Sequence, residues 1–317
     1  MKATRRVLSR MDGVLVVDKP AGPTSHDVVD RVRRATGIRR VGHTGTLDPF
    51  ATGVLPLVVG RATRLAQFLS ATDKSYDATI RLGFATDTYD ATGRVVGRAG
   101  PSDPEGSPAG PAAVLSCGDV ARALATFVGR HEQIPPPFSA KKVAGVRSHV
   151  RARQGRPVQP GAVQVEVRSL ELVAFEGDLA SVRLTCSPGF YVRALAHAVG
   201  ELLGVGAHLH SLRRTRSGGF EIVDATPLEV IEREGVQALQ RLVPLSGTAS
   251  HLPAVVISGP ALDRAVHGAL VGPADVVGAP PAGYRGPIRL MGGDGTLVAI
   301  ARPGPGAGTL HPFVVVR

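Results

Sequence analysis

Apolar and polar residues alternate with a period of two in several stretches of this chain, a pattern typical of strands that bury one face. The clearest stretch is residues 75–84. Its apolar positions share one face: Tyr76, Ala78, Ile80, Leu82 and Phe84. Residues 163–172 and 181–186 alternate in the same way, and the continuous apolar run at residues 14–17 indicates a buried strand.

Other stretches have helical spacing. After a turn at residues 20–23, Thr24 or Ser25 can cap a helix that buries three valines within residues 28–32. Residues 191–203 carry apolar positions every three or four residues, and another helix is expected near residues 62–69. Because strands and helices mix without a regular βαβ period, we predict an α+β fold with a largely antiparallel sheet.

The pattern of apolar runs and Gly/Pro-rich connections changes near residue 250, which predicts two domains, residues 1–250 and 251–317. In the second, short apolar runs alternate with connections rich in Gly and Pro, typical of a small β domain. Within the first, eight of the fifteen residues 97–111 are Gly or Pro, which indicates a loop-like insertion.

The charge balance points to a polyanionic partner. The 317 residues include 37 Lys and Arg against 26 Asp and Glu, a net charge of +11, and such a chain attracts nucleic acid. Abundant Arg, Ala, Gly and Pro can equally reflect coding bias. Aromatic residues make up only 4%, so RNA binding is expected to use backbone contacts and shape more than base stacking.

Composition also excludes several classes of protein. No apolar run approaches the roughly 18 residues of a membrane span, and the run near the N-terminus is too short for a secretory signal. With two cysteines, Cys117 and Cys186, a disulfide framework is not expected, so a cytoplasmic location is predicted. The histidines do not cluster with cysteine; His208 and His210 form an isolated pair, and no metal site is expected.

Three residues are candidates for chemistry, each with a structural alternative. Asp48 lies in a loop rich in Gly and Thr, where backbone can approach a ligand, but Asp-Pro turns are common. Tyr76 lies on the apolar face of its strand, which favours a core residue. Arg193 is offset from the apolar stripe of its helix, which favours a surface position. The spacing alone does not bring the three together.

Six segments resemble, in order, the TruB family of tRNA pseudouridine synthases. They are GHTGTLDPFATG at residues 42–53, KSYDA at 74–78, LGFATDTYD at 82–90, QIPPPFSAKK at 133–142, CSPGFYVR at 186–193 and LRRT at 212–215. The resemblance covers residues 14–222. Three positions depart from the usual pattern: Phe138 stands where Tyr is common, Phe190 replaces a frequent Thr, and His197 lies near a frequent acid.

The resemblance implies a fold and an activity. Residues 1–250 are expected to form a catalytic domain with the pseudouridine synthase fold, in which residues 131–157 close on RNA. Residues 251–317 resemble, more loosely, a PUA-like RNA-binding β-barrel. The implied reaction isomerises uridine to pseudouridine at position 55, in the T loop of tRNA. Because no atoms are gained or lost, neither cofactor nor metal is expected.

The resemblance also assigns roles to single residues. Asp48 is the implied nucleophile, Arg193 is expected to keep its carboxylate ionised, and Tyr76 is expected to stack on uracil and help remove the C5 proton. For nucleic-acid binding, Tyr191 and Leu212 are expected to wall the pocket and His43 to fill space near the flipped nucleotide.

The implied partner is the T-stem-loop of tRNA, bound by a monomer without an obligate protein partner. Arginines are expected to contact its phosphates. The candidates are Arg31, Arg33, Arg34, Arg39, Arg40, Arg147, Arg151, Arg153, Arg213 and Arg214.

Two other functions stay open at this point. A non-catalytic tRNA-binding or tRNA-folding protein could use the same scaffold without needing Asp48. A nucleoside- or glycoside-cleaving hydrolase could use Asp48 as nucleophile, but would need a second carboxylate nearby. Asp87 and Asp90 are the conceivable sources.

Overall fold

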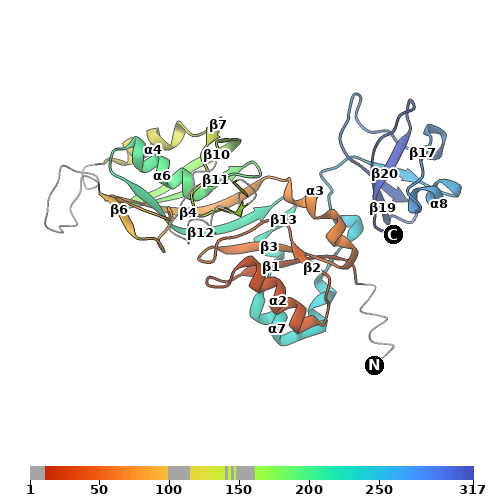
Figure 1. The fold of residues 1–317 in the computed structure, drawn as a ribbon, viewed down its shortest axis with the longest axis horizontal. Coiled ribbons are helices and arrows are strands. Elements are labelled where there is room, and N and C mark those ends of the chain that lie inside the picture. Colours follow the sequence, from red (N-terminus) through yellow and green to blue (C-terminus); the bar gives the residue numbers. More distant parts are fainter. Residues whose placement is uncertain (1–10, 99–114, 140–141, 144–145, 148–160) are drawn as a thin grey trace. The chain divides into compact units, whose positions relative to one another are not determined.

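The computed structural model of the protein describes residues 11–98, 115–139, 142–143, 146–147 and 161–317. The chain forms two compact units (Figure 1). Unit 1 contains Met1–Pro49, Gly53–Ala71 and Gly218–Arg317, and unit 2 contains Phe50–Thr52 and Thr72–Ser217. Most of the predicted insertion at residues 97–111, and residues 148–157 of the expected RNA-closing segment, lie outside the described residues.

Unit 1 begins with a strand that is buried over most of its length. The elements of its first part are β1 (Gly13–Lys19), α2 (Ser25–Thr36), β2 (Val41–His43), β3 (Thr52–Val59), the 3₁₀ segment η1 (Gly60–Leu65) and α3 (Ala66–Ser70). Those of its later part are β13 (Phe220–Glu221), η3 (Ile222–Asp224), β14 (Thr226–Pro227), α7 (Leu228–Glu234), η4 (Gly235–Arg241), β15 (Val243–Pro244) and η5 (Leu245–Gly247).

The strands of this part lie around β1. Strand β1 pairs antiparallel with β3 and with β15 and parallel with β14, while β2 pairs with β3. Helix α2 starts at a capping box between Thr24 and Asp27 and ends at Gly37, whose φ of 74° places it in the left-handed region. Helix α7 packs beside α2 (Figure 1). The strand predicted at residues 14–17 and the helix capped at Thr24 are confirmed.

The rest of unit 1 is a smaller five-stranded sheet. Its elements are β16 (Ala254–Ile257), α8 (Pro260–Val266), η6 (Pro273–Asp275), β17 (Val276–Val277), β18 (Ile288–Gly292), β19 (Leu297–Pro303) and β20 (Leu310–Val315). The strand order is β17-β16-β18-β19-β20. Leu297, Ile300 and Val316 belong to one apolar cluster with Phe68 and Leu69 of α3, so this sheet shares a core with the first part of unit 1.

Unit 2 is built on an antiparallel sheet. Its elements are β4 (Lys74–Leu82), β5 (Phe84–Thr86), β6 (Val95–Arg98), α4 (Cys117–Ala125), β7 (Gly129–Gln133), β8 (Lys142–Val143), β9 (Val146–Arg147), β10 (Val163–Glu176), β11 (Leu179–Cys186), α6 (Val192–Leu202) and β12 (Ala207–Ser217). Strands β12, β4, β11, β10 and β7 pair in that order. Helix α6 packs on β12 and β4, and α4 packs on β10 (Figure 1).

The predicted alternation positions β4 correctly, with one exception. Tyr76, Ala78, Ile80 and Leu82 are buried, as the period of two requires. Phe84 is only half-buried and starts a new strand, because Gly83, with a φ of 106°, ends β4. The prediction that Phe84 continues the apolar face is therefore wrong.

The α+β class with mainly antiparallel pairing is confirmed. The helix expected near residues 62–69 is a 3₁₀ segment followed by one α-helical turn, and the helix expected at residues 191–203 is α6.

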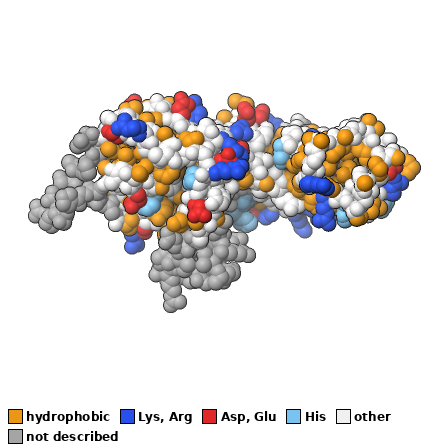
Figure 2. Space-filling view, turned by 90° about the horizontal axis from the view of Figure 1, so that it is seen from above, with side chains coloured by type: hydrophobic (Ala, Val, Ile, Leu, Met, Phe, Trp, Pro, Cys, Tyr) orange, Lys and Arg blue, Asp and Glu red, His pale blue; other side chains and the backbone are white. Residues whose placement is uncertain are grey.

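No helix among the described residues is both long and apolar enough to cross a bilayer. On the face seen in Figure 2, Lys and Arg side chains form separate small groups, several of them beside acidic side chains.

Candidate active site

Asp48 lies in unit 1, in the loop between β2 and β3, and is half-buried. The loop has no regular secondary structure, as its Gly, Thr and Pro content predicts. Its geometry is nevertheless fixed, because the residues on both sides of Asp48 bind to β1 and α2 through buried polar side chains.

Leu47 is held by Ser25, in the first turn of α2. The buried Ser25 hydroxyl accepts a hydrogen bond from the Leu47 N–H at 2.8 Å and donates to the Leu47 carbonyl at 3.1 Å. One side chain therefore satisfies both backbone groups of the residue that precedes Asp48.

Pro49 is held by Lys19, at the end of β1. The Lys19 side chain is completely buried, and its Nζ donates to the carbonyls of Pro20 at 2.9 Å and Pro49 at 3.1 Å. The Gly22 N–H also donates to the Pro49 carbonyl, at 2.8 Å. Asp48 is thus flanked by two anchored residues, which limits the directions that its carboxylate can take.

His43 is the last residue of β2 and lies in the same unit as Asp48. It is half-buried and pairs with Leu57 of β3. The short β2–β3 pairing therefore fixes where the Asp48 loop begins.

Tyr76 lies in unit 2 on β4, where it is 8% exposed. In the sheet it lies opposite Leu184 of β11 and Arg214 of β12. Leu212, also buried, lies opposite Ala78 one pair further along the same face. The sheet therefore places Tyr76 and Leu212 on neighbouring strands beneath α6.

Arg193 is in the first turn of α6 and is only 5% exposed. Its Nη1 donates to the Thr88 carbonyl and its Nη2 to the Phe138 carbonyl, both at 2.9 Å. Its Nη1 also lies 3.7 Å from Oδ2 of the buried Asp90. The expected surface position is therefore wrong, because backbone carbonyls and a carboxylate from distant segments offset the cost of burying the charge.

Asp90 is itself fixed by its neighbours. Its Oδ1 accepts hydrogen bonds from the hydroxyls of Thr88 at 2.8 Å and Thr92 at 2.6 Å, and from the Thr92 N–H at 3.0 Å. This leaves Oδ2 facing the Arg193 guanidinium. Asp87 accepts the Arg94 N–H at 2.8 Å, so both carboxylates considered for a hydrolase have structural partners.

Tyr191 is the N-cap residue of α6 and is half-buried. The Gln133 amide binds its backbone twice: Oε1 accepts from the Tyr191 N–H at 2.8 Å, and Nε2 donates to the Tyr191 carbonyl at 3.1 Å. Gln133 thereby fixes the start of the helix that carries Arg193.

A buried lysine and a buried thiol lie two residues from Tyr76. Lys74 on β4 pairs with Cys186 on β11. Burial, followed by the charge of Arg214, lowers the pKa of Lys74 to about 8. Burial raises the pKa of Cys186 to about 12, so this thiol is protonated at neutral pH and is a poor nucleophile.

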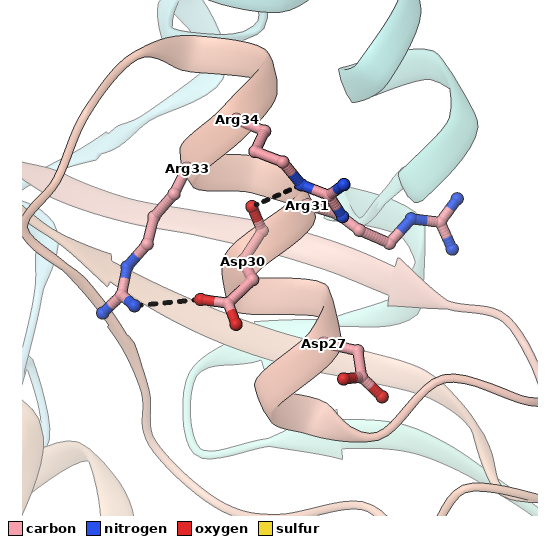
Figure 3. Close-up of a pocket in the computed structure, with 5 residues that line it drawn as sticks. All are labelled: Asp27, Asp30, Arg31, Arg33 and Arg34. Atoms are coloured by element: carbon pink, nitrogen blue, oxygen red, sulfur yellow. Dashed lines mark hydrogen bonds and ion pairs between the residues drawn. The ribbon is translucent and has the colours of Figure 1, made fainter.

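Helix α2 carries an open pocket lined by Asp27, Asp30, Arg31, Arg33 and Arg34 (Figure 3). All three of these arginines, predicted to bind phosphate, have protein partners, and Arg34 donates to the Asp30 carbonyl at 3.4 Å. Arg31 binds Glu232 through two hydrogen bonds of 2.6 Å, which lower the pKa of that carboxyl. Arg33 binds Asp30 at 3.0 Å and the Val41 carbonyl at 2.6 Å. These contacts stabilise α2 and compete with phosphate binding by Arg31 and Arg33.

Other predicted phosphate contacts are also constrained. Arg214 is 1% exposed, which leaves little of its surface for contact with a phosphate. Arg213 donates to the Thr52 hydroxyl at 3.3 Å. Arg34, Arg39 and Arg40 are exposed, and Arg40 donates to the Thr63 hydroxyl at 2.6 Å. Arg151 and Arg153 lie outside the described residues.

The predicted site residues fall into two groups. Unit 1 carries His43 and Asp48, and unit 2 carries Tyr76, Tyr191, Arg193 and Leu212. Sequence reasoning did not predict that Lys19, Ser25, Asp90 and Gln133 hold them: it named Ser25 only as a possible helix cap and Asp90 only as a possible second carboxylate. A usable signal existed for Lys19, a cation directly after an apolar strand and before a turn. Among the described residues, no group of three or more His, Cys, Asp or Glu could bind a metal.

Comparisons with known proteins agree with the resemblance of the motifs. Residues 33–192 match the family described as "TruB family pseudouridylate synthase (N terminal domain)", and residues 193–244 match the "tRNA pseudouridylate synthase B C-terminal domain". A tRNA pseudouridine synthase B from Thermobifida fusca is 42% identical over 313 residues, covering 96% of this chain and 98% of the relative. Another from Symbiobacterium thermophilum is 45% identical over 270 residues, covering 84% of this chain and 85% of the relative.

Solved structures share the fold. The archaeal box H/ACA sRNP Nop10-Cbf5 complex contains a chain that matches 98% of this one, with 88% of its own length covered, a TM-score of 0.73 and 23% identity. A chain of a Cbf5-Nop10-Gar1 complex matches 94% of this one, with 79% of its own length covered, a TM-score of 0.71 and 28% identity. On its motifs, its family matches and its relatives, this chain belongs to the TruB family of tRNA pseudouridine synthases.

Proposed function

We propose that the chain isomerises uridine to pseudouridine at position 55, in the T loop of tRNA, with Asp48 as the nucleophile. The N1–C1′ bond of the uridine breaks, the uracil turns over, and a C5–C1′ bond forms. C5 loses a proton and N1 gains one, so the reaction is balanced without a cofactor. This chemistry needs one nucleophilic carboxylate, a group that accepts the C5 proton, and a site that retains the detached base.

The observation that supports Asp48 most directly is the double anchoring of its loop. Ser25 binds Leu47 and Lys19 binds Pro49, and both side chains are buried. A nucleophile whose neighbours are fixed loses little entropy on reaching a reactive geometry, which favours catalysis over a purely structural Asp-Pro turn.

The role proposed for Arg193 is to keep the Asp48 carboxylate ionised. In unit 2 the two carbonyl contacts fix the orientation of the guanidinium plane. The planar, forked guanidinium suits bidentate pairing with a carboxylate. Arg193→Lys keeps the charge but loses the fork. We expect it to lower kcat far more than tRNA affinity; an equal loss of both would reject the assignment.

The role proposed for Tyr76 is to stack on the target uracil and to help remove the C5 proton. Its ring is largely buried on β4, so its position is set by the sheet. Tyr76→Phe keeps the ring and removes the hydroxyl. Slower turnover with unchanged tRNA affinity is expected, and wild-type turnover would reject the role in proton removal.

The target nucleotide must leave its folded loop before it can react, which costs a few kcal/mol of unstacking. We propose that Tyr191 and Leu212 wall the pocket that receives it and that His43 fills space beside it. Arginine contacts to phosphate offset the cost, with Arg34, Arg39 and Arg40 as exposed candidates. Affinity should then fall steeply as the salt concentration rises.

The decisive experiment incubates the protein with unmodified tRNA and maps pseudouridine, with Asp48→Asn as the control. Pseudouridine at position 55 that is lost in the variant supports the proposal. Modification of a different position would reject the T-loop assignment. If the wild-type chain binds tRNA but forms no pseudouridine, the tRNA-folding alternative is favoured. Release of free uracil would favour the hydrolase.

We further propose that the enzyme acts as a cytoplasmic monomer without a protein partner, and that residues 251–317 form a PUA-like RNA-binding domain after a catalytic domain of residues 1–250. Activity of the purified chain alone, at the mass of one copy by light scattering, would support the first part. Loss of tRNA affinity after substitutions on the β16–β20 sheet would support the second.

A further inference from the structure

Tyr89 has a backbone conformation that few bulky residues adopt. Its φ is +64°, and among the described residues it shares a positive φ outside glycine with Ala249. A large L-residue in the left-handed region is strained, and such strain persists only where other contacts hold it. The contacts of Tyr89 therefore indicate which function its strained backbone serves.

Three contacts hold Tyr89. Its N–H donates a hydrogen bond to the Thr86 carbonyl at 3.2 Å. Its carbonyl accepts a hydrogen bond from the Leu209 N–H of β12 at 2.9 Å. Its ring stacks on the imidazole of His197, with ring centroids 3.9 Å apart and planes 7° from parallel. His197 is four residues after Arg193 on α6, so the two side chains lie on the same face of the helix.

The residues on both sides of Tyr89 bind the Arg193 guanidinium. The Thr88 carbonyl accepts from its Nη1 at 2.9 Å, and Oδ2 of Asp90 lies 3.7 Å from the same nitrogen. The φ of Tyr89 sets the angle between the preceding peptide and the following residue. A return of Tyr89 to negative φ would turn one of the two acceptors away from Arg193.

His197 contributes its ring plane and not its hydrogen-bonding groups. Its Nδ1 is buried and has no hydrogen-bond partner among the described residues. Burial lowers the pKa of His197, although Glu201 on the next turn opposes this, so the ring is neutral at neutral pH. A neutral ring whose buried nitrogen is unused fits a stacking partner.

We propose that the Tyr89–His197 stack positions Arg193 for the isomerisation: it holds the strained Tyr89 backbone and thereby keeps the Thr88 carbonyl and Asp90 aimed at the guanidinium. This inference rests on the role of Arg193 in the proposed function. In this proposal the two rings act through Arg193, so Tyr89 and His197 are positioning residues.

The test compares His197→Ala, His197→Leu and His197→Phe by single-turnover pseudouridine formation and by tRNA Kd. His197→Ala should lower the rate about 3- to 10-fold, the range expected for losing one aromatic pair, with Kd within about twofold of wild type. His197→Phe keeps the ring plane and should restore most of the rate. Leu202→Ala, an exposed change on the same helix, is the matched control.

If His197→Ala does not fold, His197→Leu replaces it, because leucine fills the space without a ring plane. A rate for His197→Leu equal to that of His197→Phe would overturn the proposal, as would a wild-type rate for His197→Ala. An equal loss of rate in Leu202→Ala would also overturn the proposal, since substitutions elsewhere on α6 would then have the same effect.

A double-mutant cycle separates positioning from general stability. In an Arg193→Lys background the fork is already lost, so adding His197→Ala should lower the rate little further. Losses that multiply independently would reject the coupling. The controls also separate this inference from the proposed function. A full rate in Arg193→Lys rejects the role of Arg193, whereas a slow Arg193→Lys beside a full-rate His197→Ala rejects only the stack.

Discussion

Replacing Ser25 with alanine tests whether the anchored loop around Asp48 matters for catalysis. The substitution removes the hydroxyl that satisfies both backbone groups of Leu47 in a buried site. Each buried donor or acceptor left unpaired costs about 1–3 kcal/mol, so leaving both Leu47 groups unpaired should lower the free energy of unfolding by about 2–6 kcal/mol. Because Leu47 directly precedes Asp48, the carboxylate becomes less well positioned, and kcat should fall ~10-fold or more.

Thr24→Ala is the matched control, because Thr24 caps the same end of α2 without touching the loop. Its hydroxyl accepts from the Asp27 N–H at 3.1 Å, and losing such a cap costs about 1 kcal/mol. Urea unfolding measures the stability of both variants, and single-turnover assays at fixed salt measure their rates. The reasoning is refuted if Ser25→Ala keeps a wild-type kcat despite its lower stability, or if Thr24→Ala slows turnover as much.

Three further predictions follow from other buried polar groups. Lys19→Met removes the hydrogen bonds that the Lys19 Nζ donates to the Pro20 and Pro49 carbonyls; kcat should fall ~10-fold while tRNA affinity, measured by filter binding, stays within about threefold. Gln133→Ala should lower the unfolding free energy by about 2 kcal/mol through its two lost bonds to Tyr191, with Gln133→Glu intermediate because it keeps the acceptor. Burial lowers the pKa of Lys74 to about 8 in the folded chain, whereas an unfolded lysine titrates at about pH 10.4. Between these two pH values the unfolded state binds more protons than the folded state. The contribution of Lys74 to the unfolding free energy therefore rises with pH over this range. The difference in unfolding free energy between wild type and Lys74→Met should increase by up to about 3 kcal/mol across that range, and a flat difference would contradict the shift.

Much of the fold follows from periodicity alone. Alternation identified β4 and its buried face, and short apolar runs identified four strands of the C-terminal sheet. Such patterns work because the period of the side chains follows directly from backbone geometry. The failure at Phe84 has an equally local cause, since Gly83 adopts a positive φ and ends the strand, and a glycine within an alternating run does not by itself reveal its φ.

The burial of Arg193 could not be predicted in this way. Its helix pattern places it beside the apolar stripe, and arginine beside such a stripe is usually exposed. Arg193 can be buried because it donates hydrogen bonds to the carbonyls of Thr88 and Phe138, which lie 105 and 55 residues earlier in the chain. Backbone acceptors have no sequence signature, because every residue carries one.

The fastening residues follow one physical principle. Ser25 and Lys19 bind backbone groups next to Asp48, Gln133 binds the backbone of Tyr191, and Arg193 is itself held mainly by carbonyls. Because such acceptors survive any side-chain substitution, the geometry of the site depends on the path of the backbone more than on the identity of the neighbouring side chains. The residues that set that path, such as the left-handed Tyr89, can therefore matter for catalysis even though they touch no substrate.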